Sequence, residues 1–179
     1  MVMNQMRISM SRRIFLIVSA AVLAFMTLSH TGWAAEAMQH SMDKTYSKKT
    51  ITYALATQMV AAAVARAKEL KIKQNVAVVD EGGNLKAFGR MDGAVLLGIE
   101  GSQRKAYTAL FGFGTADFYN AIKDDPSLLV GLSHFSGATV VGGGLPITID
   151  GEVVGGIGVG GGTVEQDIDC AKAGLKVLE

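Results

Sequence analysis

The sequence contains a single cysteine, Cys170, and this excludes two common ways of cross-linking a small fold. One thiol cannot form a disulfide within the chain, and there is no cysteine pair for a zinc site of the Cys-x-x-Cys kind. An oxidising compartment is therefore permitted without being used for cross-links. We predict that Cys170 is a buried apolar residue of the last helix rather than a reactive thiol.

Histidine is equally scarce, and the common catalytic motifs are missing. The histidines are His30, His40 and His134, and no two of them have the spacing of a metal site. There is no G-x-S-x-G elbow for a serine nucleophile and no Gly-Lys-Ser/Thr triplet for a phosphate loop. The glycine run 158–162 follows a predicted hairpin strand, not the parallel βαβ unit of a dinucleotide-binding fold.

Basic residues show no excess beyond the N-terminus. Three of the 17 basic residues and none of the 16 acidic residues lie in the first 35 positions, so the remainder carries 14 basic against 16 acidic side chains. A protein that binds nucleic acid needs a clustered positive surface. The composition gives no reason to expect one, whereas a hydrophobic share of 49% suffices for a sizeable core.

Residues 1–35 have the composition of a cleavable export leader. Two arginines precede the apolar run 14–28, whose length of about 15 residues suits a signal peptide and is short for a membrane span. Residues 11–16 are close to the twin-arginine export pattern, although a general secretory signal would fit as well. Small residues predict cleavage after Ala34 or Ala37 and a periplasmic or secreted product without a stable membrane span. An uncleaved anchor is the alternative.

Residues 36–48 are polar and mixed, and we interpret them as a flexible lead-in to one domain over residues 49–179. Periodicity and turn residues predict an α+β domain with a mostly antiparallel sheet and flanking helices. The predicted helices are 50–70, 95–111, 115–123 and 163–178, and the predicted strands are 76–80, 85–88, 139–141, 146–149 and 152–159.

Glycine is abundant, with 22 residues, most of them in the last third of the chain. Glycines within the predicted strand 152–159 indicate that another backbone or a ligand approaches closely. Asp150-Gly151 between two apolar runs predicts a hairpin turn. Thr163 and Gln166 predict a capping box at the start of the last helix, where backbone amides could hold a carboxylate.

Several separated stretches occur in an order that carries a family resemblance. They are 76–85 (VAVVDEGGNL), 90–94 (RMDGA), 104–109 (RKAYTA), 142–147 (GGGLPI) and 151–161 (GEVVGGIGVGG), followed by Gln166-Asp167. Over about residues 50–178 the chain resembles the GlcG/HbpS family of haem-binding proteins, which includes the C-terminal domain of PduO-type proteins. The resemblance implies a profilin-like fold with a five-stranded sheet, homo-oligomers and haem binding. In the secreted branch it also implies haem degradation and redox sensing with a partner sensor kinase.

Haem needs an apolar slot, cationic or amide groups for two propionates, and an axial donor to iron. Glycine-lined strands would leave room for the flat ring. The resemblance implies a threonine as the iron contact, and Thr108 and Thr115 both lie near the matching region, with Tyr107 and His134 as alternative donors. The candidate propionate partners are Arg90, Arg104, Lys105 and the helix start at Gly160 and Gly161.

These observations leave competing functions open. The first is an exported haem-binding protein that acts in haem scavenging, haem degradation or as a redox-sensor accessory. The second is a periplasmic enzyme or binding protein for a small carboxylate or aromatic compound of a catabolic pathway, with Arg90 or Arg104 holding the carboxylate. The third is an oligomeric interaction module without a ligand of its own.

Overall fold

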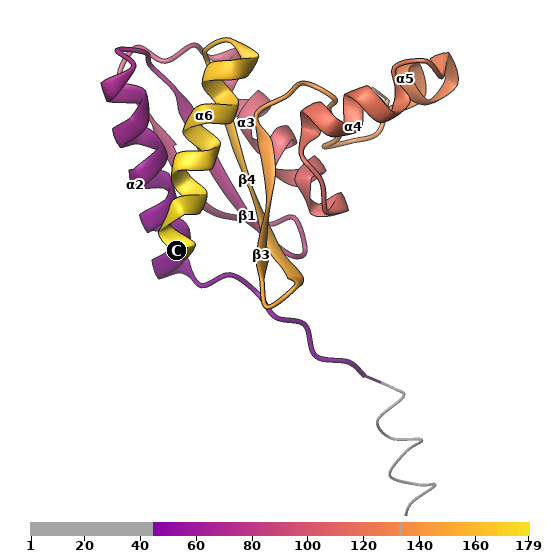
Figure 1. Cartoon of the computed structure of the whole chain (residues 1–179), viewed down its shortest axis with the longest axis horizontal. Helices are drawn as coiled ribbons and strands as arrows, with labels where there is room; N and C mark the ends of the chain where they lie inside the picture. Colours follow the sequence, from indigo (N-terminus) through magenta and orange to yellow (C-terminus); the bar gives the residue numbers. More distant parts are fainter. Residues whose placement is uncertain (1–44, 133) are drawn as a thin grey trace, which may run out of the picture. The chain divides into compact units, whose positions relative to one another are not determined.

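The computed structural model describes residues 45–132 and 134–179, and Figure 1 shows their arrangement. A compact unit spans Lys48–Glu179. The predictions of a leader, its cleavage sites and most of the lead-in fall on residues 1–44, outside the described residues. The unit Lys48–Glu179 carries the sheet, the helices and the pocket considered below.

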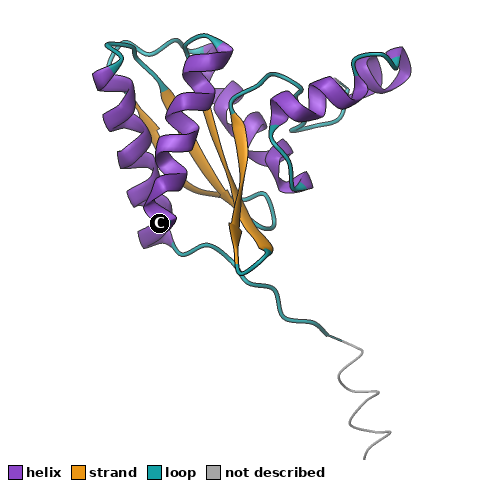
Figure 2. Ribbon diagram, viewed as in Figure 1, coloured by secondary structure: helices purple, strands orange, loops and turns teal. Residues whose placement is uncertain are grey.

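Within the described residues, four antiparallel strands form one sheet in the order β2-β1-β4-β3 (Figure 2). They are β1 (Asn75–Asp80), β2 (Leu85–Arg90), β3 (Gly144–Ile149) and β4 (Glu152–Gly160). The α+β class is confirmed, as are both hairpins. Asp150 and Gly151 have φ angles of 52° and 79°, the left-handed pair that a tight hairpin turn requires.

The predicted strand 139–141 is wrong, because these residues are coil in the described part of the chain. The backbone N–H of Thr139 donates to the hydroxyl of Thr108, and the N–H of Val141 donates to the hydroxyl of Thr139. Side-chain oxygens thus take the hydrogen bonds that a neighbouring strand would need. The sheet therefore has four strands here, not the five that the resemblance implies.

Helices cover both faces of the sheet (Figure 1). Helices α2 (Tyr53–Glu69) and α6 (Val164–Leu175) lie side by side on one face, and α3 (Leu97–Thr108) lies on the other. Figure 1 shows α4 (Thr115–Ile122) and α5 (Pro126–Leu132) as an arm beside the sheet. Short 3-10 turns follow α3 and α6, at Ala109–Phe111 and Lys176–Leu178. No helix among the described residues has both the length and the apolar character of a membrane span.

The arm contains one helix more than predicted. The predicted helix 115–123 ends as α4 at Ile122, and α5 begins at Pro126, where the missing N–H costs no hydrogen bond. The Asp125 carboxylate accepts from the N–H of Ser127 and begins that helix. Thr115, considered above beside Thr108 for the iron contact, is the first residue of α4 after Gly114. Its side chain is buried, and its hydroxyl accepts from the N–H of Gly144.

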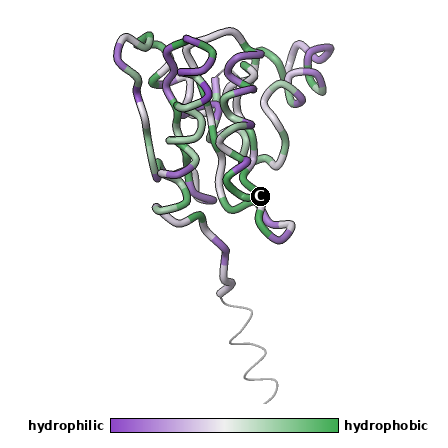
Figure 3. The backbone as a smooth tube through the Cα atoms, turned by 60° about the vertical axis from the view of Figure 1, so that its left-hand side comes forward, coloured by the Kyte–Doolittle hydropathy of each residue, from purple (hydrophilic) through white to green (hydrophobic). Residues whose placement is uncertain are grey.

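The main core lies between the sheet and helices α2 and α6. Val76 and Val78 of β1 and Ile157 of β4 point to this side and are fully buried, as is Met59 of α2. Cys170 of α6 is buried in the same core. Figure 3 shows the tube changing between hydrophobic and hydrophilic colours along the helices, as expected for helices that bury one face.

The opposite face of β4 is made of glycine. Gly156, Gly158 and Gly160 occupy alternate positions, and a Cβ on Gly156 or Gly158 would overlap the carbonyl oxygen of Ala106 or Ser102 in α3. The missing side chains let the α3 backbone contact the strand directly. The interpretation that the strand glycines leave room for a flat ligand is therefore wrong for Gly156 and Gly158, because α3 fills that space.

We predict that Gly158→Ala lowers the free energy of unfolding by about 1–3 kcal/mol or more, because the added methyl would force α3 away from β4. Gly101→Ala in α3 is the matched control, since a Cβ there has no neighbour within 4 Å. It should raise stability by roughly 0.5–1 kcal/mol through helix propensity. Urea unfolding of both variants tests this, and equal stabilities would contradict the close helix–strand contact.

Cys170 is predicted to be chemically silent in the folded protein. Its side chain is buried, and desolvation raises the pKa of its thiol to about 11. At pH 8 only about one thiol in a thousand would be ionised, and the thiolate is the reactive form. Ellman's reagent should therefore titrate no thiol in the native protein and one per chain in guanidinium. Rapid native modification would show that α6 does not pack as described.

Candidate functional site

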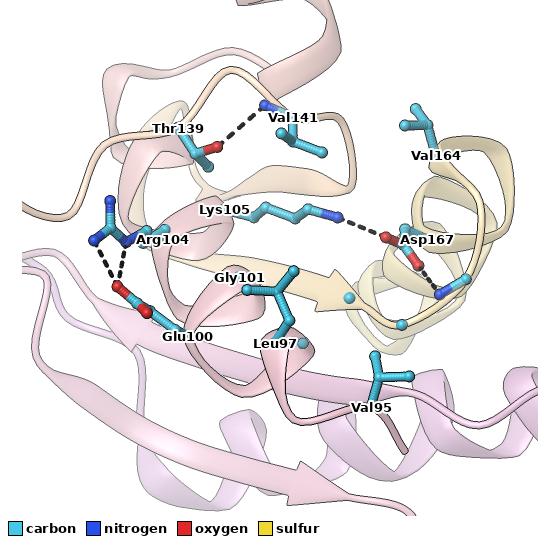
Figure 4. Close-up of a pocket in the computed structure, with 14 residues that line it drawn as sticks. Val95, Leu97, Glu100, Gly101, Arg104, Lys105, Thr139, Val141, Val164 and Asp167 are labelled. Atoms are coloured by element: carbon cyan, nitrogen blue, oxygen red, sulfur yellow. Dashed lines mark hydrogen bonds and ion pairs between the residues drawn. The ribbon is translucent and has the colours of Figure 1, made fainter. Parts of the chain in front are cut away.

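A pocket of about 520 Å³ lies between α3 and the start of α6 (Figure 4). Ligand sites in proteins commonly have volumes of about 300–1,000 Å³. Its walls come from Val95 and the first three turns of α3, from the coil residues Thr139 and Val141, and from the end of β4 and the start of α6. The pocket thus combines parts of the chain that lie far apart in sequence.

Apolar side chains form much of the rim. Val95, Leu97, Val141 and Val164 line the pocket and are all exposed, Leu97 to 82%. Between them Gly101 leaves open space, since a Cβ there would meet no atom within 4 Å. Exposed apolar groups around a concavity are typical of a site that covers a hydrophobic ligand.

Lys105 and Asp167 form a buried ion pair in the pocket wall. The Lys105 Nζ lies 2.5 Å from the Asp167 Oδ2 and donates a second hydrogen bond of 2.9 Å to the carbonyl oxygen of Val159. The two side chains are 6% and 4% exposed. An uncompensated charge at such a position would be costly, so each side chain requires the other. The pair therefore holds α3, the end of β4 and the start of α6 together.

Asp167 also satisfies the start of α6. Its Oδ1 accepts hydrogen bonds from the backbone N–H of Gly162 and from the buried amide of Gln74, at 3.1 and 2.9 Å. Thr163 and Gln166 form the predicted capping box. The backbone amides that were expected to bind a ligand carboxylate therefore donate to side chains of the chain itself. The Asp167 carboxylate takes the place of a ligand anion at this helix start.

Arg104 provides a cation that is accessible from the pocket. Its Nε lies 2.8 Å from the Oε1 of Glu100, one helical turn earlier, and the two side chains are 39% and 64% exposed. Such an exposed pair contributes little stability. The guanidinium can therefore exchange Glu100 for the carboxylate of a ligand, which it can hold in two-pronged fashion.

A smaller pocket of about 290 Å³ shares Glu100 and Arg104 with the larger one. Tyr107 lines it, and the Tyr107 ring lies against the backbones of Gly83 and Gly137. Arg104 therefore stands between a larger, mainly apolar pocket and a smaller one that contains a phenol.

The predicted site residues separate into two groups. Arg104, Lys105, Gly160 and Gly161 all line the larger pocket. Thr108 does not, because its side chain is fully buried, donates to the carbonyl oxygen of Arg104 and accepts from the N–H of Thr139. Its hydroxyl is a structural link between α3 and the coil.

The remaining predicted residues lie elsewhere. Arg90 ends β2 and donates to the carbonyl oxygen of Ala94 at 3.4 Å, and His134 is exposed beyond the end of α5. Neither lines the larger or the smaller pocket. No group of three or more His, Cys, Asp or Glu side chains in the described part of the chain is arranged to hold a metal ion.

Sequence reasoning missed several residues of the pocket. Leu97, Gly101 and Val141 gave no local signal, because each is an ordinary residue of a predicted helix or strand. Asp167 stood in the quoted Gln166-Asp167 stretch, but its partner Lys105 is 62 positions away.

Comparisons with known proteins agree with this fold. The sequence profile of the family described as "Haem degrading protein HbpS-like" matches residues 51–176. The chain is 39% identical over 136 residues to an uncharacterized 15.0 kDa protein of Citrobacter freundii, a match that covers 75% of this chain and 96% of that protein. It is 34% identical over 139 residues to the corrinoid adenosyltransferase PduO of Salmonella typhimurium, covering 74% of this chain but only 41% of PduO.

Two solved structures are similar over most of their length. A double mutant of HbpS from Streptomyces reticuli has a TM-score of 0.70 and 31% identity, with 76% of this chain and 92% of that chain covered. The complex of PduOC with haem has a TM-score of 0.67 and 32% identity, with 72% of this chain and 94% of that chain covered.

We predict that Asp167→Asn lowers the free energy of unfolding by about 3–5 kcal/mol, because it leaves the Lys105 ammonium buried without a counter-charge. Asp169→Asn is the matched control two residues away, since Asp169 pairs with Arg66 at the surface, where ion pairs contribute little. Thermal and urea unfolding test the difference. Equal, small losses in both variants would contradict a structural role for the buried pair.

Proposed function

The chain belongs to the HbpS-like family, and we propose that it is an exported haem-binding protein whose ligand site is the pocket between α3 and the start of α6. The observation that carries the proposal is the combination of an apolar rim with the accessible cation of Arg104 in one pocket of about 520 Å³. The similar structure of PduOC with haem supports the choice of ligand.

The residues of the pocket fit the organic part of haem. Leu97, Val141 and Val164 would contact the faces and edges of the ring, and burial of apolar area would provide most of the affinity. Arg104 would hold a propionate in exchange for Glu100. The Lys105 ammonium is already paired with the Asp167 carboxylate. We therefore propose that Lys105 is a structural residue of the pocket wall and does not bind a propionate.

The same residues do not fit the iron. Proteins hold haem iron through His, Cys, Met or Tyr, and none of these lines the larger pocket among the described residues. Haem held through its ring and its carboxylates alone would exchange readily. This favours scavenging or delivery within the exported compartment over the other proposed roles, namely haem degradation and accessory function beside a redox sensor.

Export and self-association belong to the same proposal. The leader predicted over residues 1–35 supports a periplasmic or secreted location. Exposed aromatic side chains beside the arm, Phe111 and Phe113 among them, support association into a homo-oligomer, because large exposed apolar groups commonly mark protein contacts. Secretion of a tagged full-length chain, and the mass of the secreted product by light scattering, test these two points.

A small aromatic carboxylate is the second candidate ligand. The pocket volume suits such a compound as well as part of a larger ring system, and Arg104 would hold its carboxylate. Benzoate or a similar compound that displaces bound hemin at micromolar concentration would favour this alternative.

Hemin titration of the mature protein, followed at the Soret band, tests the proposed site. Gly101→Leu should raise the Kd for hemin at least about tenfold, because the new side chain fills open space in the pocket. Gly131→Leu in α5 is the matched control, since a Cβ there also meets nothing within 4 Å. It should leave the Kd within about twofold.

Substitution of the two arginines provides a second comparison in the same assay. Arg104→Met should raise the Kd for hemin by about 3–10-fold, the value of one partly exposed charge-assisted contact. Arg90→Met should change it by less than about twofold, because Arg90 lies outside both pockets. Identical affinities for wild type, Gly101→Leu and Arg104→Met would place the ligand elsewhere.

A further inference from the structure

We propose that the pocket recognises the porphyrin ring and its carboxylates without ligating the iron, so that it binds metal-free porphyrin dicarboxylates as well as it binds haem. This inference rests on the proposed function and concerns the selectivity of the same site. It follows from the side chains that line the pocket, from the hydrogen bonds that these side chains already make within the chain, and from the positions of the residues that could ligate iron.

The polar side chains of the pocket are engaged within the chain. Asp167 accepts from Lys105, Gln74 and the N–H of Gly162. Glu100 accepts from Arg104. The remaining hydroxyl, that of Thr139, accepts from the N–H of Val141. A neutral hydroxyl and two paired carboxylates form a poor donor set for haem iron, for which proteins use imidazole, thiolate, thioether or phenolate.

Among residues 45–132 and 134–179, no His, Cys, Met or Tyr side chain lines the larger pocket. Tyr107 faces the smaller pocket, beyond Arg104. The sulfur of Met91 accepts from the N–H of Gln74, and Cys170 is buried in the core on the opposite face of the sheet. His134 lines neither pocket. Ligation by any of these residues would require the described fold to rearrange.

The groups that do face the pocket interact with features that all porphyrin dicarboxylates share. Val95, Leu97, Val141 and Val164 present apolar surface to a flat ring, and this contribution depends on area rather than on a metal. Arg104 recognises a carboxylate. Because neither contribution changes when iron is removed, the affinity for the metal-free ring should equal that for haem.

Parallel titrations of the mature protein with hemin and with protoporphyrin IX test the inference. Hemin is followed at the Soret band and protoporphyrin IX by its fluorescence, in the same detergent-free buffer. We expect the Kd for hemin and the Kd for protoporphyrin IX to agree within about threefold, which is a small difference in binding free energy. Gly101→Leu should weaken both ligands by the same factor, and Gly131→Leu should weaken neither.

Spectra and donor variants complete the test. Bound hemin should keep a spectrum without a strong-field protein ligand, and the variants Tyr107→Phe, His134→Ala and His40→Ala should each leave its Kd within about twofold. Hemin binding at least tenfold tighter than protoporphyrin IX, or a selective loss of hemin in one of these variants, would overturn the inference while the haem site stands. Failure of both ligands to bind would overturn the proposed function together with it.

Discussion

The direct contact between the backbone of α3 and the glycine face of β4 is the constraint on which the site depends. Alternation of glycine with isoleucine and valine along β4 gives the strand two different faces. Its large side chains fill the core beneath α2 and α6, while its bare face accepts α3 at a distance that no other residue would allow. Only at this separation can Lys105 of α3 reach the carbonyl oxygen of Val159 at the end of the same strand.

The buried ion pair of Lys105 and Asp167 fixes the start of α6 relative to α3, and the pocket lies between these two helices. Removing two charges from water is costly, and their attraction offsets that cost only when both remain in place. The pair is therefore weak evidence for high stability, but it strongly limits where α6 can begin relative to α3. With the start of α6 fixed and its amides satisfied by Asp167, Gln166 and Thr163, the space between the two helices stays open and is bordered by Leu97, Arg104 and Val164.

Local signals predicted the fold better than they predicted the site. Hairpin turns and the capping box are encoded by neighbouring residues such as Asp150-Gly151 and Thr163 with Gln166, and they were confirmed. The strand glycines were ambiguous, because a missing side chain accommodates a helix and a ligand equally well until the partner is known. Thr108 shows the same limit. Its hydroxyl accepts a hydrogen bond from the backbone N–H of Thr139, and nothing in the sequence around Thr108 predicts this contact. Arg104 was proposed because a guanidinium can hold a carboxylate with two hydrogen bonds, whereas the residues of the apolar rim have the same side chains as ordinary core residues.

Hydrogen–deuterium exchange of the protein, with and without hemin, tests the location of the site most directly. We predict slower exchange in peptides from the first turns of α3 and from the β4–α6 connection, about residues 95–105 and 159–168. The β1–β2 hairpin turn and the arm formed by α4 and α5 should be unchanged. Protection confined to the hairpin turn or to the arm, with none at the two helix starts, would contradict the account.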